Sequence, residues 1–373
     1  MGREYTCNGR RGHSMKATLA AAFIVAQTGS WLAAAGAAQT TDEACPAEGE
    51  MQFLCGIQGA EDIVHLGDSN WLLASGMGAE GQDGAVHLID GRNKTFKAIF
   101  PAEAAGISPD TQMYPNCPGA PDPETFTAHG LSLNRVGPSE DGSYRLLAIN
   151  HAREAVEVFS VQETASEPDI TWVGCVIMPE GTYTNSVAAL PDGGFVATKM
   201  FDPSKPNAFA EIRAGKISGL VYEWRPGEGF SVVPGSAMSG PNGIEVSPDG
   251  QWIYVATFGS KELVRLSRDG TAPEHEAIPV TFSVDNLRWT NDGRLLAAGT
   301  NPPDPGCTGE SCGGWTVVSW NPEDMTTTPV LSHTGASAIK GVSVAIEALG
   351  YIWIGSFTDN KVGYIPVAIP VTE

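Results

Sequence analysis

A turn signal recurs six times along the chain, each time just before a short run that favours β-structure. The turns are Gly67-Asp68, Asp141-Gly142, Asp192-Gly193, Asp249-Gly250, Asp292-Gly293 and Leu349-Gly350. The runs that follow are 71–75, 144–148, 195–198, 252–256, 294–298 and 351–355. A unit of about 50 residues with a hairpin at its centre has the size of one four-stranded propeller blade. We therefore predict an all-β fold, a six-bladed β-propeller with four antiparallel strands per blade.

Composition supports an all-β chain and limits its partners. The 373 residues include 44 Gly and 26 Pro, with 42% hydrophobic and 17% charged residues, which excludes a disordered chain and argues against an all-helical one. A formal net charge of −21 argues against binding to nucleic acid or to an anionic membrane surface, because like charges repel. A pair of β-sandwiches is the alternative fold.

The N-terminal segment has the pattern of an export signal. Lys16 precedes an uncharged, Ala-rich run at 17–38 that ends in small residues. A transmembrane anchor is the alternative, but the polar residues at 27–30 interrupt the apolar core. We predict a signal peptide at 1–38, in which 1–14 is either a long basic region or an upstream mis-start. The product is then periplasmic or secreted, and no later stretch is apolar enough to span a bilayer.

Six cysteines remain in the domain predicted at 39–373, a single propeller. An even number of cysteines in an oxidising compartment predicts disulfides. We favour local pairs: Cys45–Cys55, Cys117–Cys175 and Cys307–Cys312. A metal site on the last pair is the alternative, although no second pair of Cys or His accompanies it.

A polar residue stands at a fixed distance before most of the turns. Five turn residues have a polar residue seven positions before them: Asp68, Asp192, Asp249, Asp292 and Gly350. The polar residues are, in the same order, Glu61, Asn185, Asn242, Asp285 and Ser343. In the remaining unit His129 stands twelve residues before Asp141, as if 135–140 were an insertion. Equivalent positions of successive blades surround the central channel of a propeller. We therefore predict that these six side chains, here called the ring residues, converge near one mouth of that channel.

The ring residues are rich in oxygen donors. Two carboxylates and several amide carbonyls suit a hard divalent cation with six to eight ligands, above all Ca²⁺. The candidate ligands are Glu61, Asn185, Asn242, Asp285 and the neighbouring Asn286. Zinc would require more His or Cys ligands. For each Asn taken singly the alternative is a turn or strand-end cap, in particular for Asn242 between Pro241 and Gly243.

Two histidines belong to one blade. His129 is a ring residue, and His151 ends the strand that follows. A single His is more often structural, but two in one blade favour a catalytic pair, since neutral His can take a proton from water and pass it on. Four other histidines receive no catalytic role, the first two because they lie in apolar strand patterns: His65, His87, His275 and His333.

Six short motifs follow one another along the chain in a characteristic order. They are Glu61-Asp62-Ile63, His129-Gly130-Leu131-Ser132, Asn150-His151, Asn185-Ser186-Val187, Pro241-Asn242-Gly243-Ile244 with Ser247-Pro248-Asp249-Gly250, and Val284-Asp285-Asn286. From about residue 55 to the C-terminus the chain resembles the paraoxonase/arylesterase group, which belongs with the gluconolactonase-like, calcium-dependent six-bladed propellers. No His-Glu-x-x-His motif occurs, so a zincin mechanism lacks its anchor.

The resemblance implies a set of site residues. It implies one catalytic Ca²⁺ held by Glu61, Asn185, Asn242, Asp285 and Asn286. It also implies His129 as general base and His151 as its proton-shuttling partner. Asp62 matches a ligand of the group's second, structural calcium, but Ser186 stands where that site would want a second Asp, which leaves the second ion open.

The resemblance also implies the activity. It implies an exported, calcium-dependent hydrolase of lactones or aryl esters, with a small-molecule ester or lactone as its partner. A gluconolactonase-like sugar lactonase and a propeller that binds a partner around a structural ion are the alternatives. No Cys follows Cys312, so the disulfide that ties the chain ends of paraoxonases is absent, and closure of the propeller must depend on strand pairing.

Overall fold

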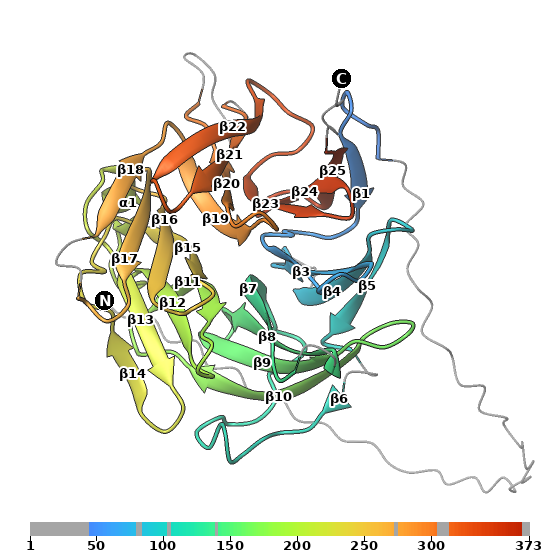
Figure 1. The fold of residues 1–373 in the computed structure, drawn as a ribbon, viewed down its shortest axis with the longest axis vertical. Coiled ribbons are helices and arrows are strands. Elements are labelled where there is room, and N and C mark those ends of the chain that lie inside the picture. The colour runs from blue at the N-terminus through green and yellow to red at the C-terminus, as the bar shows by residue number, and fades with distance from the viewer. Residues whose placement is uncertain are drawn as a thin grey trace, which may run out of the picture. The chain divides into compact units, whose positions relative to one another are not determined.

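The predicted propeller is the fold that the structure has. The computed structural model describes residues 45–79, 84–102, 106–138, 141–271, 275–303 and 313–367. These residues form six antiparallel sheets that follow one another in chain order around a centre, five with four strands and one with a fifth strand added (Figure 1). The signal peptide predicted at 1–38 and the pair Cys307–Cys312 lie outside the described residues.

The first three blades run from the innermost strand outward in sequence order. Blade 1 consists of β2 (Ile63–His65), β3 (Trp71–Gly76), β4 (Ala85–Asp90) and β5 (Thr95–Phe100). Blade 2 consists of β7 (Ala128–Arg135), β8 (Ser143–Asn150), β9 (Ala155–Gln162) and β10 (Asp169–Ile177), with β6 (Gly106–Ile107) added in parallel to β10. Blade 3 consists of β11 (Tyr183–Ala189), β12 (Phe195–Phe201), β13 (Leu220–Arg225) and β14 (Gly229–Val232), and helix α1 (Ala208–Arg213) lies between its second and third strands.

The last three blades repeat the pattern. Blade 4 consists of β15 (Pro241–Val246), β16 (Trp252–Thr257), β17 (Glu262–Ser267) and β18 (Glu276–Pro279). Blade 5 consists of β19 (Ser283–Trp289), β20 (Leu295–Thr300), β21 (Trp315–Asn321) and β22 (Thr326–His333). Blade 6 consists of β23 (Val342–Ala348), β24 (Tyr351–Ser356), β25 (Lys361–Pro366) and the N-terminal strand β1 (Gln52–Cys55). The innermost strands β2, β7, β11, β15, β19 and β23 contact one another in a closed circle.

Local turn chemistry explains why the hairpins form where they do. Each of the six turns predicted from the sequence joins the first and second strands of its blade. The glycine of every one of these turns has a positive φ, between 53° and 96°. A residue with a Cβ adopts that conformation only at a cost, so the glycines determine where each innermost strand ends.

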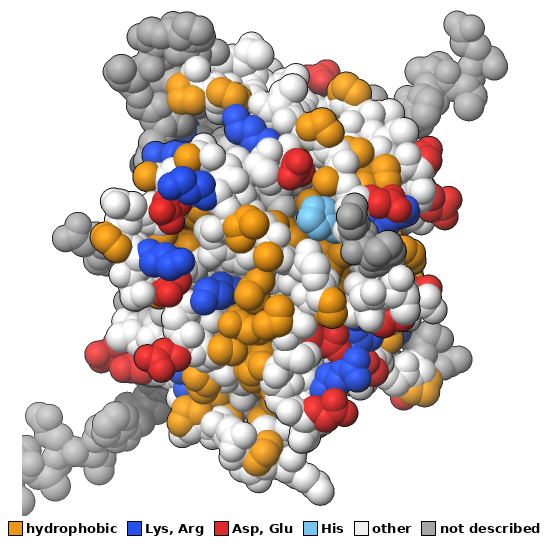
Figure 2. Space-filling view, turned by 90° about the vertical axis from the view of Figure 1, so that its left-hand side faces the viewer, with side chains coloured by type: hydrophobic (Ala, Val, Ile, Leu, Met, Phe, Trp, Pro, Cys, Tyr) orange, Lys and Arg blue, Asp and Glu red, His pale blue; other side chains and the backbone are white. Residues whose placement is uncertain are grey.

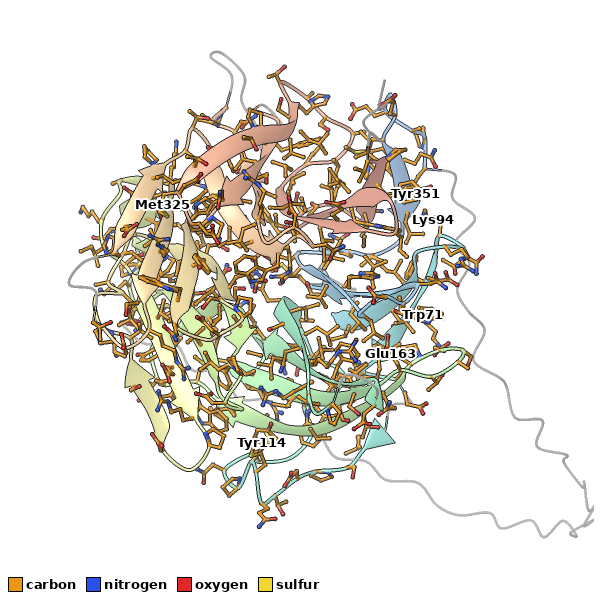
Figure 3. The ribbon with its side chains drawn as sticks, viewed as in Figure 1. Trp71, Lys94, Tyr114, Glu163, Met325 and Tyr351 are labelled. Carbon is orange, nitrogen blue, oxygen red and sulfur yellow. A yellow bond between two sulfur atoms is a disulfide. The ribbon has the colours of Figure 1, made fainter. Side chains whose placement is uncertain are left out.

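Strand pairing closes the circle, as expected in the absence of a terminal disulfide. The N-terminal strand β1 pairs antiparallel with β25 and so becomes the outermost strand of the last blade. Lys94, from the turn after β4, adds a contact between the first and last blades, with its Nζ 4.0 Å from the centre of the Tyr351 ring (Figure 3). The two ends of the propeller are thus held by backbone hydrogen bonds and by a cation–π contact.

Apolar side chains fill the space between neighbouring blades. Side chains alternate between the two faces of a strand, so each blade can pack on both sides. Between blades 1 and 2, for example, Phe100 meets Phe126 and Phe159 edge to face at 5.1 and 4.9 Å between ring centres. Among the described residues, no helix has the length and hydropathy that crossing a bilayer would require.

Two of the three predicted disulfides are present. Cys45 is bonded to Cys55 of β1, and Cys117 is bonded to Cys175 of β10. The first ties the segment before β1 to the closing strand, and the second ties the long loop before β7 to its own blade.

A pH-dependent loss of stability follows from His87 in β4. Burial lowers the pKa of His87 to about 4, and the ring packs edge-on against Phe96. Between pH 6.5 and pH 4 the unfolded chain therefore binds a proton here that the folded chain does not, so stability falls as the pH falls. We expect His87→Leu to reduce the loss of unfolding free energy between pH 7 and pH 4.5 by about 2 kcal/mol. Urea unfolding at both pH values tests this, and equal losses in the two proteins would contradict it.

Candidate active site

The innermost strands depart from regular pairing at the ring positions. The register breaks enclose His129-Gly130 in β7, Asn185-Ser186 in β11, Asn242-Gly243 in β15, Asp285-Asn286 in β19 and Ser343 in β23. In blade 1, Glu61 and Asp62 directly precede β2. A β-bulge inserts a residue and changes the direction of the side chains around it. The same irregularity thus recurs in five blades, at the level that the sequence predicted for a common site.

Contacts across the channel join blades 1, 2, 5 and 6 at Glu61. Asn286 Nδ2 donates a hydrogen bond to Glu61 Oε1 at 2.6 Å, and Ser343 Oγ donates to the Glu61 carbonyl at 2.6 Å. His129 Nδ1 lies 4.0 Å from Glu61 Oε2. Glu61 is therefore a common contact of residues that are far apart in the sequence.

Further contacts complete the circle through blades 3 and 4. His129 Nδ1 donates to the Asn185 carbonyl at 2.7 Å, and Thr198 Oγ1 donates to the Asn242 carbonyl at 2.7 Å. The Asn242 side chain is hydrogen-bonded to Asp285. Contacts thus link ring residues of neighbouring blades around the channel, and Asn286 is bonded to Glu61.

The candidate ligands are buried, and several of their oxygens have no partner. All five are at most 5% exposed. Within the described ranges, four of their side-chain oxygens accept no hydrogen bond: Glu61 Oε2, Asn185 Oδ1, Asn242 Oδ1 and Asn286 Oδ1. Buried polar atoms are nearly always paired, so four unpaired oxygens in one place require an explanation. Oxygens arranged around a hard cation provide one, and this donor set fits Ca²⁺.

Two carboxyl groups of the site hold their protons more tightly than an exposed carboxyl group does. Burial raises the pKa of Glu61 to about 7, although the hydrogen bond from Asn286 opposes the shift. Burial, together with the charges of Glu61 and Asp62, raises the pKa of Asp285 well above its usual range. Among the described residues no group of three or more His, Cys, Asp or Glu side chains is arranged to hold a metal, so the donor set depends on amide oxygens as well as carboxylates.

His129 is held as a neutral base. Burial, and next the charge of the neighbouring His151, lower its pKa to about 3, so the ring is uncharged near pH 7. A carbonyl oxygen only accepts, so the bond to Asn185 requires the proton on Nδ1. The Nε2 atom of His129 then carries a lone pair that can accept a proton.

His151 lies directly against His129. The two ring centres are 4.7 Å apart, and His151 Nδ1 donates to Glu154 Oε1 at 2.7 Å. In the described structure the Nε2 atom of His151 is buried without a hydrogen-bond partner. Glu154, which has a positive φ of 44°, also accepts a bond from the Thr184 amide and so holds His151 against blade 3. Glu154 is not among the site residues predicted from the sequence, where its only local signal is a carboxylate three residues after a histidine.

Aromatic rings extend outward from His151. Tyr183 stacks on His151 at 4.3 Å between ring centres, and Phe201 stacks on Tyr183 at 4.5 Å. Phe209 of α1 follows at 5.0 Å and is 49% exposed. One wall of the candidate site is therefore apolar. A separate band of hydrophobic side chains lies on the outer side of the molecule, where blades 3 and 4 lie (Figure 2).

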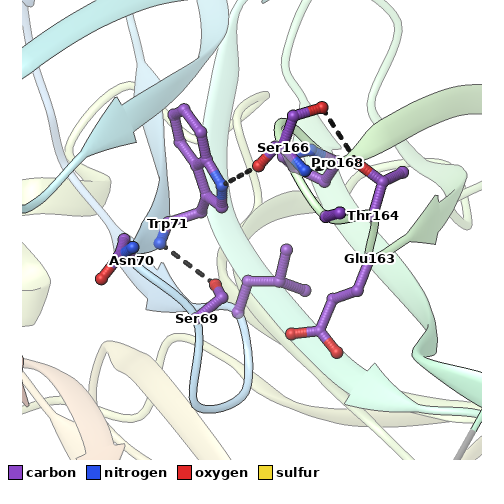
Figure 4. Close-up of a pocket in the computed structure, with 9 residues that line it drawn as sticks. Ser69, Asn70, Trp71, Glu163, Thr164, Ser166 and Pro168 are labelled. Carbon is purple, nitrogen blue, oxygen red and sulfur yellow. Dashed lines mark hydrogen bonds between the residues drawn. The ribbon is translucent and has the colours of Figure 1, made fainter.

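A surface pocket between blades 1 and 2 is a separate feature. It is lined by Leu66, Ser69, Asn70, Trp71, Glu163, Thr164, Ala165, Ser166 and Pro168, and Trp71 Nε1 donates to the Ser166 carbonyl across it (Figure 4). Its blade 1 residues lie at the turn between β2 and β3, whereas Glu61 lies at the opposite end of β2. No ring residue lines this pocket, so it is not part of the candidate site.

Comparison of the sequence with known proteins finds relatives among the paraoxonases. No protein-family model matches the chain. Human serum paraoxonase/lactonase 3 is 24% identical over 326 residues, which cover 80% of this chain and 83% of the relative. Human serum paraoxonase/arylesterase 1 is 25% identical over 188 residues, 48% of this chain and 50% of the relative. The chain is a distant homologue of the paraoxonases.

Solved structures support the same fold. A gluconolactonase from Xanthomonas campestris has a TM-score of 0.50 at 16% identity, covering 85% of this chain and 90% of that one. A protein of unknown function from Bacteroides thetaiotaomicron has a TM-score of 0.54 at 11% identity, covering 86% and 72%. At these identities the likeness to solved structures shows the propeller fold alone.

Proposed function

We propose that this protein is an exported, calcium-dependent hydrolase of lactones or aryl esters. The observation that carries the proposal is the cluster of four buried, unpaired oxygens beside a neutral histidine. The homology supports it, because the relatives are named as a lactonase and an arylesterase. The apolar wall formed by Tyr183, Phe201 and Phe209 supports an uncharged acyl or aryl group in the substrate.

Five residues would hold the ion: Glu61, Asn185, Asn242, Asp285 and Asn286. A Ca²⁺ bound there supplies a Lewis acid that polarises the ester carbonyl and stabilises the negative charge that develops on its oxygen. These five residues also exclude bulk water from this position, since all of them are almost fully buried.

His129 would act as the general base. Its Nε2 takes a proton from the attacking water, while its Nδ1–H remains bonded to the Asn185 carbonyl and keeps the ring in place. The imidazolium that forms is stabilised by Glu61, whose Oε2 lies 4.0 Å from Nδ1. His151, which is held by Glu154, would then relay the proton outward.

Export is the second part of the proposal. The disulfides Cys45–Cys55 and Cys117–Cys175 support it, because such bonds persist in oxidising compartments. With the signal predicted at 1–38, the mature protein would be the single propeller domain at 39–373, in the periplasm or outside the cell.

A panel of substrates tests the activity. Lactones of varied ring size and chain length, together with phenyl esters, are offered to the purified protein with Ca²⁺, after EDTA treatment, and after Ca²⁺ is restored. We expect hydrolysis that EDTA abolishes and Ca²⁺ recovers. Hydrolysis at the full rate after EDTA treatment would contradict the proposal. Binding of Ca²⁺ without hydrolysis of any substrate would instead favour a propeller that binds a partner.

A further inference from the structure

A buried arginine occupies the channel next to the ring residues. Arg288 belongs to β19, two residues after Asn286, and is 4% exposed. Its guanidinium donates hydrogen bonds to three backbone carbonyls, Ile63 in blade 1 at 3.0 Å, Leu131 in blade 2 at 2.9 Å and Leu287 in blade 5 at 2.7 Å. Carbonyls from three blades therefore converge on one positive charge.

Two carboxylates complete the surroundings of this guanidinium. Asp62 of blade 1 forms an ion pair with Nη2, and Glu245 of blade 4 forms one with Nη1 at 3.0 Å. Three carbonyl and two carboxylate oxygens, drawn from four blades, are the kind of ligands that a hard metal cation prefers. In this chain a side chain of fixed positive charge occupies the centre of that cage.

The same residues do not fit a second metal ion. The Asp62 carboxylate already accepts bonds from the amides of Ile63 at 2.9 Å and Leu131 at 2.7 Å, in addition to Arg288. Ser186, in the bulge of β11, offers a hydroxyl where the resemblance calls for a carboxylate. The Asp62 carboxylate is therefore paired with Arg288 and is not free to act as a metal ligand.

We infer that the Arg288 guanidinium is the structural cation of the channel, in place of a second metal ion. The arginine links blades 1, 2, 4 and 5 permanently, whereas a bound ion would link them only while it is present. The folded propeller is then independent of metal, and this chain binds Ca²⁺ at the ring residues alone.

The first test asks whether any second calcium site exists. The double variant Glu61→Gln/Asp285→Asn removes both carboxylates from the ring. We expect its Tm to change by less than about 1 °C when Ca²⁺ is added or chelated, because the linkage between binding and stability is lost with the site. A remaining Ca²⁺-dependent rise in Tm that Asp62→Asn abolishes would overturn the inference. If the wild type binds no Ca²⁺ at all, the proposed function fails, while the second test still decides the role of Arg288.

The second test removes the guanidinium. Arg288→Ala leaves Asp62 and Glu245 buried without their counter-charge, so we expect the Tm to fall by about 5–10 °C in EDTA. The control is Arg265→Ala, because Arg265 also bonds a carboxylate and a carbonyl, but its partner Glu276 is exposed. Its Tm should fall by less than about 2 °C. If Arg288→Ala does not fold, Arg288→Lys takes its place: it retains the charge but not the planar fork of donors, so its Tm should lie below that of the wild type. Equal Tm values for the two alanine variants would overturn the inference, as would a wild-type Tm in Arg288→Lys.

Discussion

Glu61→Gln is expected to abolish calcium-dependent hydrolysis. The change removes a charge from the carboxylate whose Oε2 is unpaired, and it places an amide that can donate where Oε1 now accepts from Asn286 Nδ2. Either orientation of the new amide therefore costs a ligand oxygen or a hydrogen bond. We expect kcat/KM to fall by about 10³-fold or more, equivalent to about 4 kcal/mol of transition-state stabilisation.

Calcium titration and lactone hydrolysis, measured on the same preparation, check this result. The matched control is Glu347→Gln, which changes an exposed glutamate on β23, also an innermost strand. That control should retain wild-type rates and calcium affinity. Unchanged calcium binding in Glu61→Gln would remove Glu61 from the ligand set.

His129→Gln is expected to separate catalysis from metal binding. Glutamine can still donate to the Asn185 carbonyl, which His129 Nδ1 reaches at 2.7 Å, but it cannot accept a proton from water. The loss of a general base typically costs about 10²–10⁴-fold, so kcat should fall by that factor. Calcium affinity should be unchanged, because His129 is not among the proposed ligands.

The measurement is kcat and calcium affinity side by side, with His275→Gln as the control. His275 is exposed, is not a ring residue, and directly precedes β18, the outermost strand of blade 4. Wild-type turnover in His129→Gln would exclude His129 as the general base, but it would not contradict the proposed calcium site. A parallel loss of calcium affinity would show instead that His129 helps to build the ring.

The propeller architecture was predictable because the residues that form its turns recur at regular positions in the sequence. A glycine with positive φ lies in the turn after each innermost strand, and the ring residue of that blade lies near the other end of the strand. The offset of Glu61, Asn242 and Asp285 from their turns therefore predicted a common level in the channel. In the structure Asp285 is bonded to Asn242, and the neighbouring Asn286 is bonded to Glu61.

Other features of the site left no comparable signal. The bulges at the ring positions insert residues without a distinctive composition; only Gly130 and Gly243 mark two of them. Glu154 and Arg288 resembled ordinary polar residues of a turn and a strand. Arg288 and Asp62 are 226 residues apart, and only the closed circle of blades brings them together.

Residue order alone was thus enough to predict six blades, a ring of oxygen donors and a pair of histidines. The protonation states and the unpaired oxygens depend on burial, which exists only after the blades enclose the channel and remove water from it. Burial makes His129 a neutral base and raises the pKa of Glu61. It also leaves Arg288 as a fixed positive charge among carbonyls of three blades, because those carbonyls meet only across the finished channel.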